Sequence, residues 1–359
     1  MRESNKIMDA DYIEINSRKI GSGFPVYIVA ELSANHRQQF DEAVKLIEAA
    51  KDAGADAVKL QTYTPDTMTI QCDAPQFRIS GGTLWDGKTL YDLYGEACTP
   101  WEWQPKLKMV AADLRIDLFS TPFDETAVDF LEVMGVPAYK VASFEVVDIP
   151  LIEYIASKGK PMIMSIGMAN LEEIGDAVQV TRSAGTQIAL LKCTSAYPAS
   201  VKEMNLLAIP HLAERFGVPV GLSDHTLETT LLAAAVALGA CIVEKHFTLS
   251  RNTSGPDSAF SLEPTEFKEM VATIRSAEKA LGKAYYGISE TEAKSRIFRR
   301  SLFVVRNMKT GDTFTEENVR SIRPGYGLAP KHLRDVLGQQ ASQDIKRGTP
   351  LSWPHVMNR

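Results

Sequence analysis

One pattern runs through most of the chain and restricts its fold more than any other feature. A short apolar, β-rich run, a polar loop and an amphipathic helical stretch follow one another eight times within about 260 residues. Eight such alternations predict a (β/α)8 TIM barrel, an α/β fold; a doubly wound parallel sheet is the competing arrangement. The predicted strands are residues 25–31, 56–61, 116–121, 138–143, 161–166, 188–193, 219–223 and 241–247.

Two segments interrupt or follow this repeat. Residues 62–100 form a long insertion after the second strand, rich in proline, glycine and aromatic residues. Loops of this length are uncommon without a function, so it is either a lid over a site or a peripheral excursion that packs its own aromatics. The chain then divides into a barrel domain (1–285), a linker (286–300) and a small, mostly β domain (301–359).

Composition excludes several classes of protein. The 359 residues have a net charge of −6 and 45 % hydrophobic residues, which is typical of a soluble globular protein and argues against a nucleic-acid binder. The N-terminal residues contain no apolar signal core, and no run is long enough to span a membrane, so we expect a cytoplasmic protein. The four cysteines are scattered without the spacing of a disulfide framework or a zinc site.

Polar residues gather at the carboxyl ends of the predicted strands. The opposite strand ends are apolar or structural, and in a TIM barrel the carboxyl-end rim carries the active site. The residues at or just beyond these ends are Glu31, Lys59, Gln61, Ser120, Thr121, Lys140, Ser143, Ser165, Ser195, Tyr197, Ser223, His225 and His246.

These residue types indicate a chemistry. Lysines and hydroxyls suit a phosphate or carboxylate, two histidines suit a divalent metal, and Glu31 suits acid or base work. The residues thus predict a metal-assisted enzyme for a phosphorylated small molecule. A Schiff-base aldolase that uses Lys59, Lys140 or Lys245 is the alternative. Each lysine could instead be an outward-facing ion-pair partner, and the histidines could be ordinary strand ends.

Several motifs in order along the chain resemble the sialic acid synthase family. They include IVAELSANH (28–36), AGADAVKLQTY (53–63), YKVASFE (139–145), GLSDHT (221–226) and EKHFTL (244–249). In the tail, RPGYGL is similar to the antifreeze-like (SAF) domain of that family. The resemblance implies a TIM barrel followed by a small, mostly β SAF domain.

Within the family, GGTLWDGKTLYDLYGEACTPWEW (81–103) and GPDSAFSLEP (255–264) resemble the enzymes that make pseudaminic acid. Neuraminic and legionaminic acid synthases more usually carry GPDHKASLEP, and they are the alternatives. The resemblance implies that phosphoenolpyruvate condenses with 2,4-diacetamido-2,4,6-trideoxy-L-altrose, with C–O cleavage, in the presence of Mn²⁺ or Mg²⁺.

The resemblance also implies roles for individual residues. His225 and His246 resemble the metal ligands, Glu31 the catalytic carboxylate, and Tyr197 and Asp257 contacts to the acceptor sugar. Arg323 resembles a tail arginine that reaches into the partner's barrel of a domain-swapped homodimer and holds an N-acetyl group. At Ser195 this chain departs from the asparagine of the neuraminate enzymes. The residues that resemble the phosphoenolpyruvate site and its neighbours are Lys59, Gln61, Thr121, Lys140, Ser143, Ser165 and Ser223.

Overall fold

The protein is represented by a computed structural model, which describes residues 12–253 and 255–357. The chain divides after Gly282 into two compact units. The prediction that the N-terminus lacks a signal sequence falls on residues 1–11, outside the described residues. Within the described ranges, no helix combines the length and the apolarity that crossing a bilayer requires.

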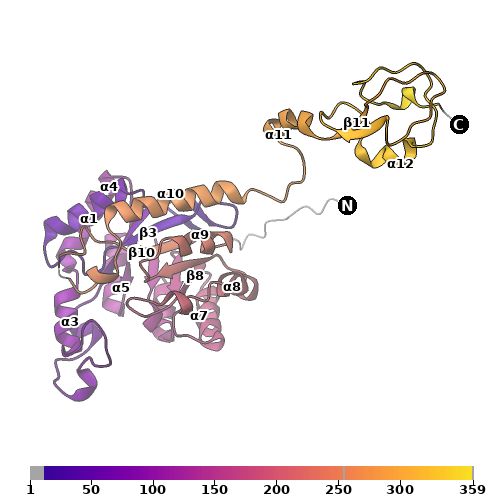
Figure 1. Ribbon diagram of the computed structural model, residues 1–359. Helices are drawn as coiled ribbons and strands as arrows, with labels where there is room; N and C mark the ends of the chain where they lie inside the picture. Colours follow the sequence, from indigo (N-terminus) through magenta and orange to yellow (C-terminus); the bar gives the residue numbers. More distant parts are fainter. Residues whose placement is uncertain (1–11, 254, 358–359) are drawn as a thin grey trace. The chain divides into compact units, whose positions relative to one another are not determined.

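The first unit is a closed, parallel, eight-stranded barrel, as predicted (Figure 1). Its strands follow one another around the barrel in chain order, and β10 closes the ring against β3. The strand bounds lie within two residues of the predicted ones. The barrel strands are β3 (Tyr27–Glu31), β4 (Ala57–Thr62), β5 (Asp117–Pro122), β6 (Tyr139–Val141), β7 (Met162–Ser165), β8 (Ile188–Cys193), β9 (Val220–Asp224) and β10 (Ile242–His246).

A helix follows each strand and covers the outside of the barrel, because its apolar stripe packs on the outward-facing strand residues. The helix after β9 is short and begins at Thr230. The covering helices are α1 (Phe40–Asp52), α4 (Gln104–Asp113), α5 (Glu125–Met134), α6 (Ile149–Ala156), α7 (Leu171–Ser183), α8 (Ala208–Phe216), α9 (Thr230–Ala237) and α10 (Pro264–Leu281).

The part of the barrel interior near the amino ends of the strands is apolar and tightly packed. Inward-facing residues such as Tyr27, Val29 and Phe119 are fully buried there. Gly221 faces the same interior, where an added Cβ would lie 2.3 Å from the carbonyl oxygen of Ile242. A glycine is therefore required at this close approach.

A hairpin that the repeat did not predict closes the barrel at the amino ends of its strands. It consists of β1 (Tyr12–Ile15) and β2 (Arg18–Gly21), and its isoleucines join the interior apolar cluster. The two turn residues, Asn16 and Ser17, both have positive φ (47° and 64°), as a type I′ hairpin turn requires. Chemistry is thereby confined to the other rim.

The insertion between β4 and α4 contains short elements: α2 (Pro65–Met68), η1 (Pro75–Phe77), α3 (Leu90–Ala97) and η2 (Trp101–Trp103).

All four cysteines are free, in agreement with the prediction.

The second unit has its own small apolar core around Leu302, Phe314 and Leu351. Residues 286–300, which read as a linker, are exposed and include a short helix. The elements of the second unit are α11 (Glu290–Ser295), η6 (Arg296–Phe298), the antiparallel strands β11 (Ser301–Val304) and β12 (Val319–Ile322), η7 (Pro330–His332), α12 (Leu333–Val336) and η8 (Trp353–His355).

Candidate active site

Charged side chains replace the apolar interior layer at the carboxyl ends of the strands. Glu31 on β3, Lys59 on β4, Lys140 on β6 and Glu244 on β10 are 0 %, 4 %, 1 % and 6 % exposed. Because side chains alternate along a strand, these residues face inward above Val29 and its neighbours. Glu244 was not among the predicted site residues.

We call these four residues the interior cluster, and three of their charged groups are in contact. Lys59 Nζ lies 2.6 Å from Glu31 Oε2 and 3.8 Å from Glu244 Oε1. Gln61 Nε2 donates to Glu31 Oε1 (2.9 Å) and to Ser33 Oγ (3.1 Å). One lysine thus bridges carboxylates from two strands, while Glu244 Oε2 is buried without a hydrogen-bond partner.

Burial and neighbouring charges change the acidity of the cluster. Burial raises the pKa of Glu31 to about 7, although the Lys59 ammonium opposes this shift. Burial also lowers the pKa of Lys140. At Glu244 burial disfavours the charged form, but the Lys140 and Lys59 ammonium groups outweigh it and hold the pKa below its usual value. Glu31 can therefore exchange a proton near neutral pH.

Hydroxyl groups surround the two interior lysines. Lys140 Nζ donates to Ser165 Oγ (2.6 Å), and Lys59 Nζ lies 3.4 Å from Thr121 Oγ1. Ser223 Oγ donates to Glu244 Oε1 at 3.0 Å. Two ammonium groups with nearby hydroxyls provide the donors that a phosphate or carboxylate needs.

A second pair of hydroxyls lies around the loop after β7. Gly167 N donates to Ser143 Oγ (3.0 Å), and a Cβ on Gly167 would lie 2.1 Å from Ser195 Oγ. Ser195 Oγ also lies 3.7 Å from Cys193 Sγ. The structure therefore brings both predicted serines to the glycine of this loop.

The two predicted metal ligands lie side by side at the rim. The ring centroids of His225 and His246 are 5.3 Å apart. His225 Nδ1 lies 3.0 Å from the carbonyl oxygen of Thr194, so it carries the proton and leaves Nε2 with a lone pair. His246 Nδ1 is buried without a hydrogen-bond partner, and burial lowers the pKa of this histidine well below its ordinary value. Burial alone would lower the pKa of His225, but the Cys193 thiol and the Thr194 carbonyl outweigh it and raise that pKa above its ordinary value. His246 thus offers a neutral nitrogen donor, and His225 offers one once it has released its second proton, as binding to a divalent metal requires.

The protein supplies few other ligands near this pair. No group of three or more His, Cys, Asp or Glu side chains suitable for a metal occurs in residues 12–253 and 255–357. Asp257 Oδ2 lies 3.9 Å from His246 Nδ1 and accepts a hydrogen bond from Ser33 Oγ. A metal held by two imidazoles would keep several coordination positions for water and substrate.

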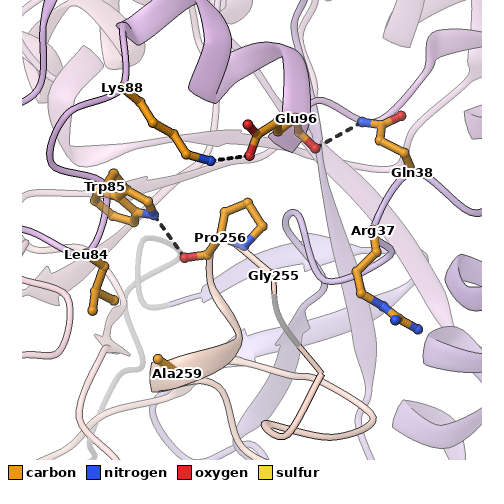
Figure 2. Close-up of a pocket in the computed structure, with 9 residues that line it drawn as sticks. All are labelled: Arg37, Gln38, Leu84, Trp85, Lys88, Glu96, Gly255, Pro256 and Ala259. Atoms are coloured by element: carbon orange, nitrogen blue, oxygen red, sulfur yellow. Dashed lines mark hydrogen bonds and ion pairs between the residues drawn. The ribbon is translucent and has the colours of Figure 1, made fainter.

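Aromatic rings cover the histidine pair. The Tyr197 ring lies 4.3 Å from the His225 ring, and the Phe260 ring lies 4.9 Å from the His246 ring. From the insertion, Trp85 lies 5.8 Å from Tyr197 and donates through Nε1 to the carbonyl oxygen of Pro256 (2.9 Å). Figure 2 shows this bond beside a pocket at the rim. The insertion thus reaches the site, although Tyr63 and Tyr94 also pack together at 5.7 Å.

Two residues considered at the rim face away from the interior. Lys245 Nζ lies 2.5 Å from Asp224 Oδ2, and both side chains are fully buried on the outer side of the barrel wall. Ser120 bonds to Thr62 (2.7 Å), which in turn donates to Gln104 of α4. The interpretations of Lys245 as an interior imine-forming lysine and of Ser120 as a rim residue were therefore wrong, because both lie at outward positions of the strand alternation.

Comparison with known proteins decides the family. A model of the NeuB family matches residues 46–286, and a SAF domain model matches residues 299–357. The chain belongs to the NeuB family. A NeuB-family chain with a C-terminal SAF domain agrees with the resemblance found in the sequence motifs, and with the barrel and the small second unit.

Several NeuB-family relatives carry names that indicate a reaction. The chain is 46 % identical to pseudaminic acid synthase of Helicobacter pylori, over 91 % of this chain and 97 % of that protein. It is 36 % identical to N,N′-diacetyllegionaminic acid synthase of Legionella pneumophila, over 94 % and 96 %. A solved structure of N-acetylneuraminic acid synthetase from Leptospira borgpetersenii superposes with a TM-score of 0.72 at 31 % identity, covering 80 % of this chain and 95 % of that one.

Most residues predicted for the site lie at one rim of the barrel. Arg323 is the exception, since it lies in the second unit, exposed directly after β12. The predictions omitted Glu244, Ser33 and Phe260. Glu244 could have been found from its place two residues before His246, because alternate strand residues share a face; the other two lie in loops and carry no such signal.

Proposed function

We propose that this NeuB-family enzyme condenses phosphoenolpyruvate with 2,4-diacetamido-2,4,6-trideoxy-L-altrose to give pseudaminic acid and phosphate. The observation that carries the reaction class is the interior cluster, in which two buried lysines and their hydroxyls lie beneath a histidine pair. The choice of acceptor rests on 46 % identity, over 91 % of the chain, to synthases named for pseudaminic acid.

In this proposal the interior cluster binds phosphoenolpyruvate. Lys59 and Lys140 provide charge, and Thr121, Ser143, Ser165 and Ser223 provide hydroxyl donors. Ser195 is a further donor beside Ser143, since both hydroxyls lie around Gly167. Because the protein carries a net charge of −6, a concentrated local cation pair is needed to hold a trianionic substrate.

His225 and His246 would hold Mn²⁺ or Mg²⁺, and the close spacing of their rings at the rim fits that role. When bound, such an ion supplies a Lewis acid that polarises the aldehyde oxygen of the sugar. The aromatic cover of Tyr197 and Phe260 keeps bulk water from the reacting carbonyl. Tyr197 and Asp257 orient the sugar, and Gln61, a neighbour of the phosphoenolpyruvate site, holds Glu31 through its 2.9 Å hydrogen bond.

Glu31 handles the proton of the attacking water. Its pKa of about 7 allows the carboxylate to accept a proton at neutral pH, and Lys59 at 2.6 Å holds it in place. The π electrons of the C2=C3 bond form the new bond from C3 to the aldehyde carbon, and the aldehyde oxygen takes up a proton from solvent to become a hydroxyl. Water adds to the electron-poor C2 and gives one proton to Glu31, which later returns it to solvent. The hydroxyl on C2 then becomes the keto group as the C2–O bond to phosphate breaks, and phosphate leaves with the bridging oxygen and the proton of that hydroxyl.

We further propose that the active enzyme is a cytoplasmic, domain-swapped homodimer whose SAF domain contributes Arg323 to a neighbouring barrel. The exposed position of Arg323 is compatible with such a contact. The test mixes Arg323→Ala subunits with Glu31→Ala subunits. Each variant alone should be inactive, and heterodimers should regain part of the activity; no recovery would contradict the exchange.

A coupled phosphate-release assay tests the reaction. Phosphoenolpyruvate is offered with the altrose derivative, N-acetylmannosamine or the legionaminate precursor sugar, with Mn²⁺ or with EDTA. The proposal expects the highest kcat/KM with the altrose derivative and loss of turnover with EDTA. A preference for another sugar would reassign the acceptor, and trapping of a lysine adduct by borohydride would favour a Schiff-base aldolase.

A further inference from the structure

Trp85, whose ring lies 5.8 Å from that of Tyr197, lines a pocket of about 470 Å³, and Figure 2 shows the residues around it. We call it the outer pocket. Three segments line it: residues 37–38 after β3, residues 84–96 of the insertion, and residues 255–259 after β10. All three extend from the carboxyl ends of strands that carry Glu31, Lys59 and His246. The outer pocket therefore opens on the same rim as the interior cluster.

The outer pocket shares a wall with the site. Its Trp85 ring lies 5.8 Å from Tyr197, whose ring lies 4.3 Å from His225. Its Ala259 directly precedes Phe260, whose ring lies 4.9 Å from His246. A substrate whose carbonyl lies at the histidines would thus direct its far end toward the outer pocket.

One side of the outer pocket is apolar. Leu84, Trp85, Pro256 and Ala259 line it, and the Leu84 side chain is 53 % exposed. An exposed leucine beside a tryptophan and a proline provides a surface for a methyl group.

The other side is polar, and its charges are compensated. Lys88 pairs with Glu96, and Arg37 Nη2 lies 3.0 Å from Glu42 Oε2. Gln38 Nε2 donates to the carbonyl oxygen of Glu96 (3.2 Å), as Figure 2 shows. Because each cation already has a carboxylate partner, this lining suits a neutral hydrogen-bonding group better than a second phosphate.

The backbone at this polar side adopts an unusual conformation. Arg37 and Gln38 both have positive φ values (51° and 55°), which side chains other than glycine rarely adopt. They are the central pair of a turn closed by the hydrogen bond from Gln39 N to the carbonyl oxygen of His36 (2.9 Å), and this turn places both side chains at the outer pocket.

We propose that the outer pocket binds the acetamido group of the acceptor sugar that lies farther from the aldehyde, at C4. The methyl group packs on Leu84 and Ala259, and the amide faces Gln38 and Arg37. This inference rests on the proposed function and makes the outer pocket the part of the site that distinguishes a 4-acetamido sugar from a 4-hydroxy sugar.

The test compares two sugars that differ only at C4: the 2,4-diacetamido altrose derivative and its 4-hydroxy counterpart. Ala259→Leu fills the pocket and Leu84→Ser removes its apolar wall. For each variant kcat/KM with the diacetamido sugar should fall about tenfold, while kcat/KM with the 4-hydroxy sugar changes less than about twofold. The KM for phosphoenolpyruvate should stay the same. Leu207→Ser, at an exposed leucine before α8, is the matched control and should change neither sugar.

The outcomes separate this inference from the proposed function. If the wild-type enzyme uses both sugars equally, or if the variants affect both alike or neither, the outer pocket does not bind the acetamido group. If the wild-type enzyme releases phosphate with neither sugar, the proposed function fails and the inference fails with it. Retention of the melting-temperature increase caused by phosphoenolpyruvate shows that each variant is folded.

Discussion

The two faces of the barrel wall at β9 and β10 use buried charges in opposite ways. On the outer face, Asp224 and Lys245 are 2.5 Å apart, and Thr226 N donates to Asp224 Oδ1 at 2.9 Å. On the inner face, Glu244 lies 3.8 Å from Lys59 and keeps one carboxylate oxygen without a hydrogen-bond partner.

This difference indicates that the Asp224–Lys245 pair stabilises the fold, whereas the interior cluster is suited to bind a substrate. A buried charge is costly unless its hydrogen bonds are satisfied, and the protein itself satisfies the outer pair. The interior cluster keeps hydrogen-bonding groups without a protein partner, and a substrate can bind to these groups. The outer pair also joins the residues that directly precede His225 and His246, so it holds the two histidines in register.

The largest expected effect is a loss of folding stability when the ion pair on the outer face of the barrel wall is broken. Lys245→Met leaves Asp224 as an unpaired buried charge, so the free energy of unfolding should fall by about 3–5 kcal/mol in urea titrations. The double variant Asp224→Asn, Lys245→Met should recover most of this loss. Lys192→Met, at a half-buried lysine on β8, is the matched control. A loss below about 1 kcal/mol for Lys245→Met would remove the structural role of the pair.

On the inner face, replacing a lysine by methionine should weaken substrate binding more than it lowers stability. Lys140→Met removes a charged donor that we propose for phosphoenolpyruvate, so kcat/KM for this substrate should fall about a hundredfold. Stability should change far less than with Lys245→Met, because burial already disfavours the charge on Lys140. Steady-state kinetics and the ligand-induced shift in melting temperature measure both effects. An unfolded Lys140→Met protein would show that the inner cluster is also structural.

A smaller, pH-dependent effect concerns Glu145, two residues after Ser143. One of its carboxylate oxygens is buried without a hydrogen-bond partner, and burial raises its pKa to about 7. The folded state therefore binds a proton that the unfolded chain releases near pH 4.5. The charge then lowers stability increasingly as the pH rises from about 4.5 through 7.

Glu145→Gln should accordingly be more stable than the wild type at pH 8, by about 1 kcal/mol, and equal to it below pH of about 4.5. Melting temperatures across this range measure the difference. Glu48→Gln, at an exposed glutamate on α1, is the control for general charge effects. A pH-independent difference would mean that the carboxylate of Glu145 is not held in a buried, unpaired state.

The sequence predicts the barrel because every barrel strand is an apolar run bounded by helix signals. It also places His225, His246, Lys59 and Lys140 at one rim, since the carboxyl ends of parallel strands meet there. Composition does not reveal which way a lysine faces. The alternation that makes Glu244 and His246 face inward also turns Lys245 outward, whereas Lys59 pairs in register with the inward-facing Glu31.

Other features depended on contacts distant in the chain. The β1–β2 hairpin has strands of four residues, too short for a clear alternation. Ser33 and Phe260 join the site through loops, and Trp85 reaches Tyr197 across the insertion. Such contacts follow from the packing of the whole unit, which no local pattern encodes.

The most direct test of the central claim, that the histidine pair and the inner cluster carry out a metal-dependent condensation, is phosphate release by three histidine variants. His225→Ala and His246→Ala should each lower kcat about a thousandfold at saturating Mn²⁺, because the Lewis acid is lost. Both should still bind phosphoenolpyruvate. His211→Ala, at an exposed histidine on α8, should keep wild-type turnover. Full turnover by either His225→Ala or His246→Ala would contradict the account.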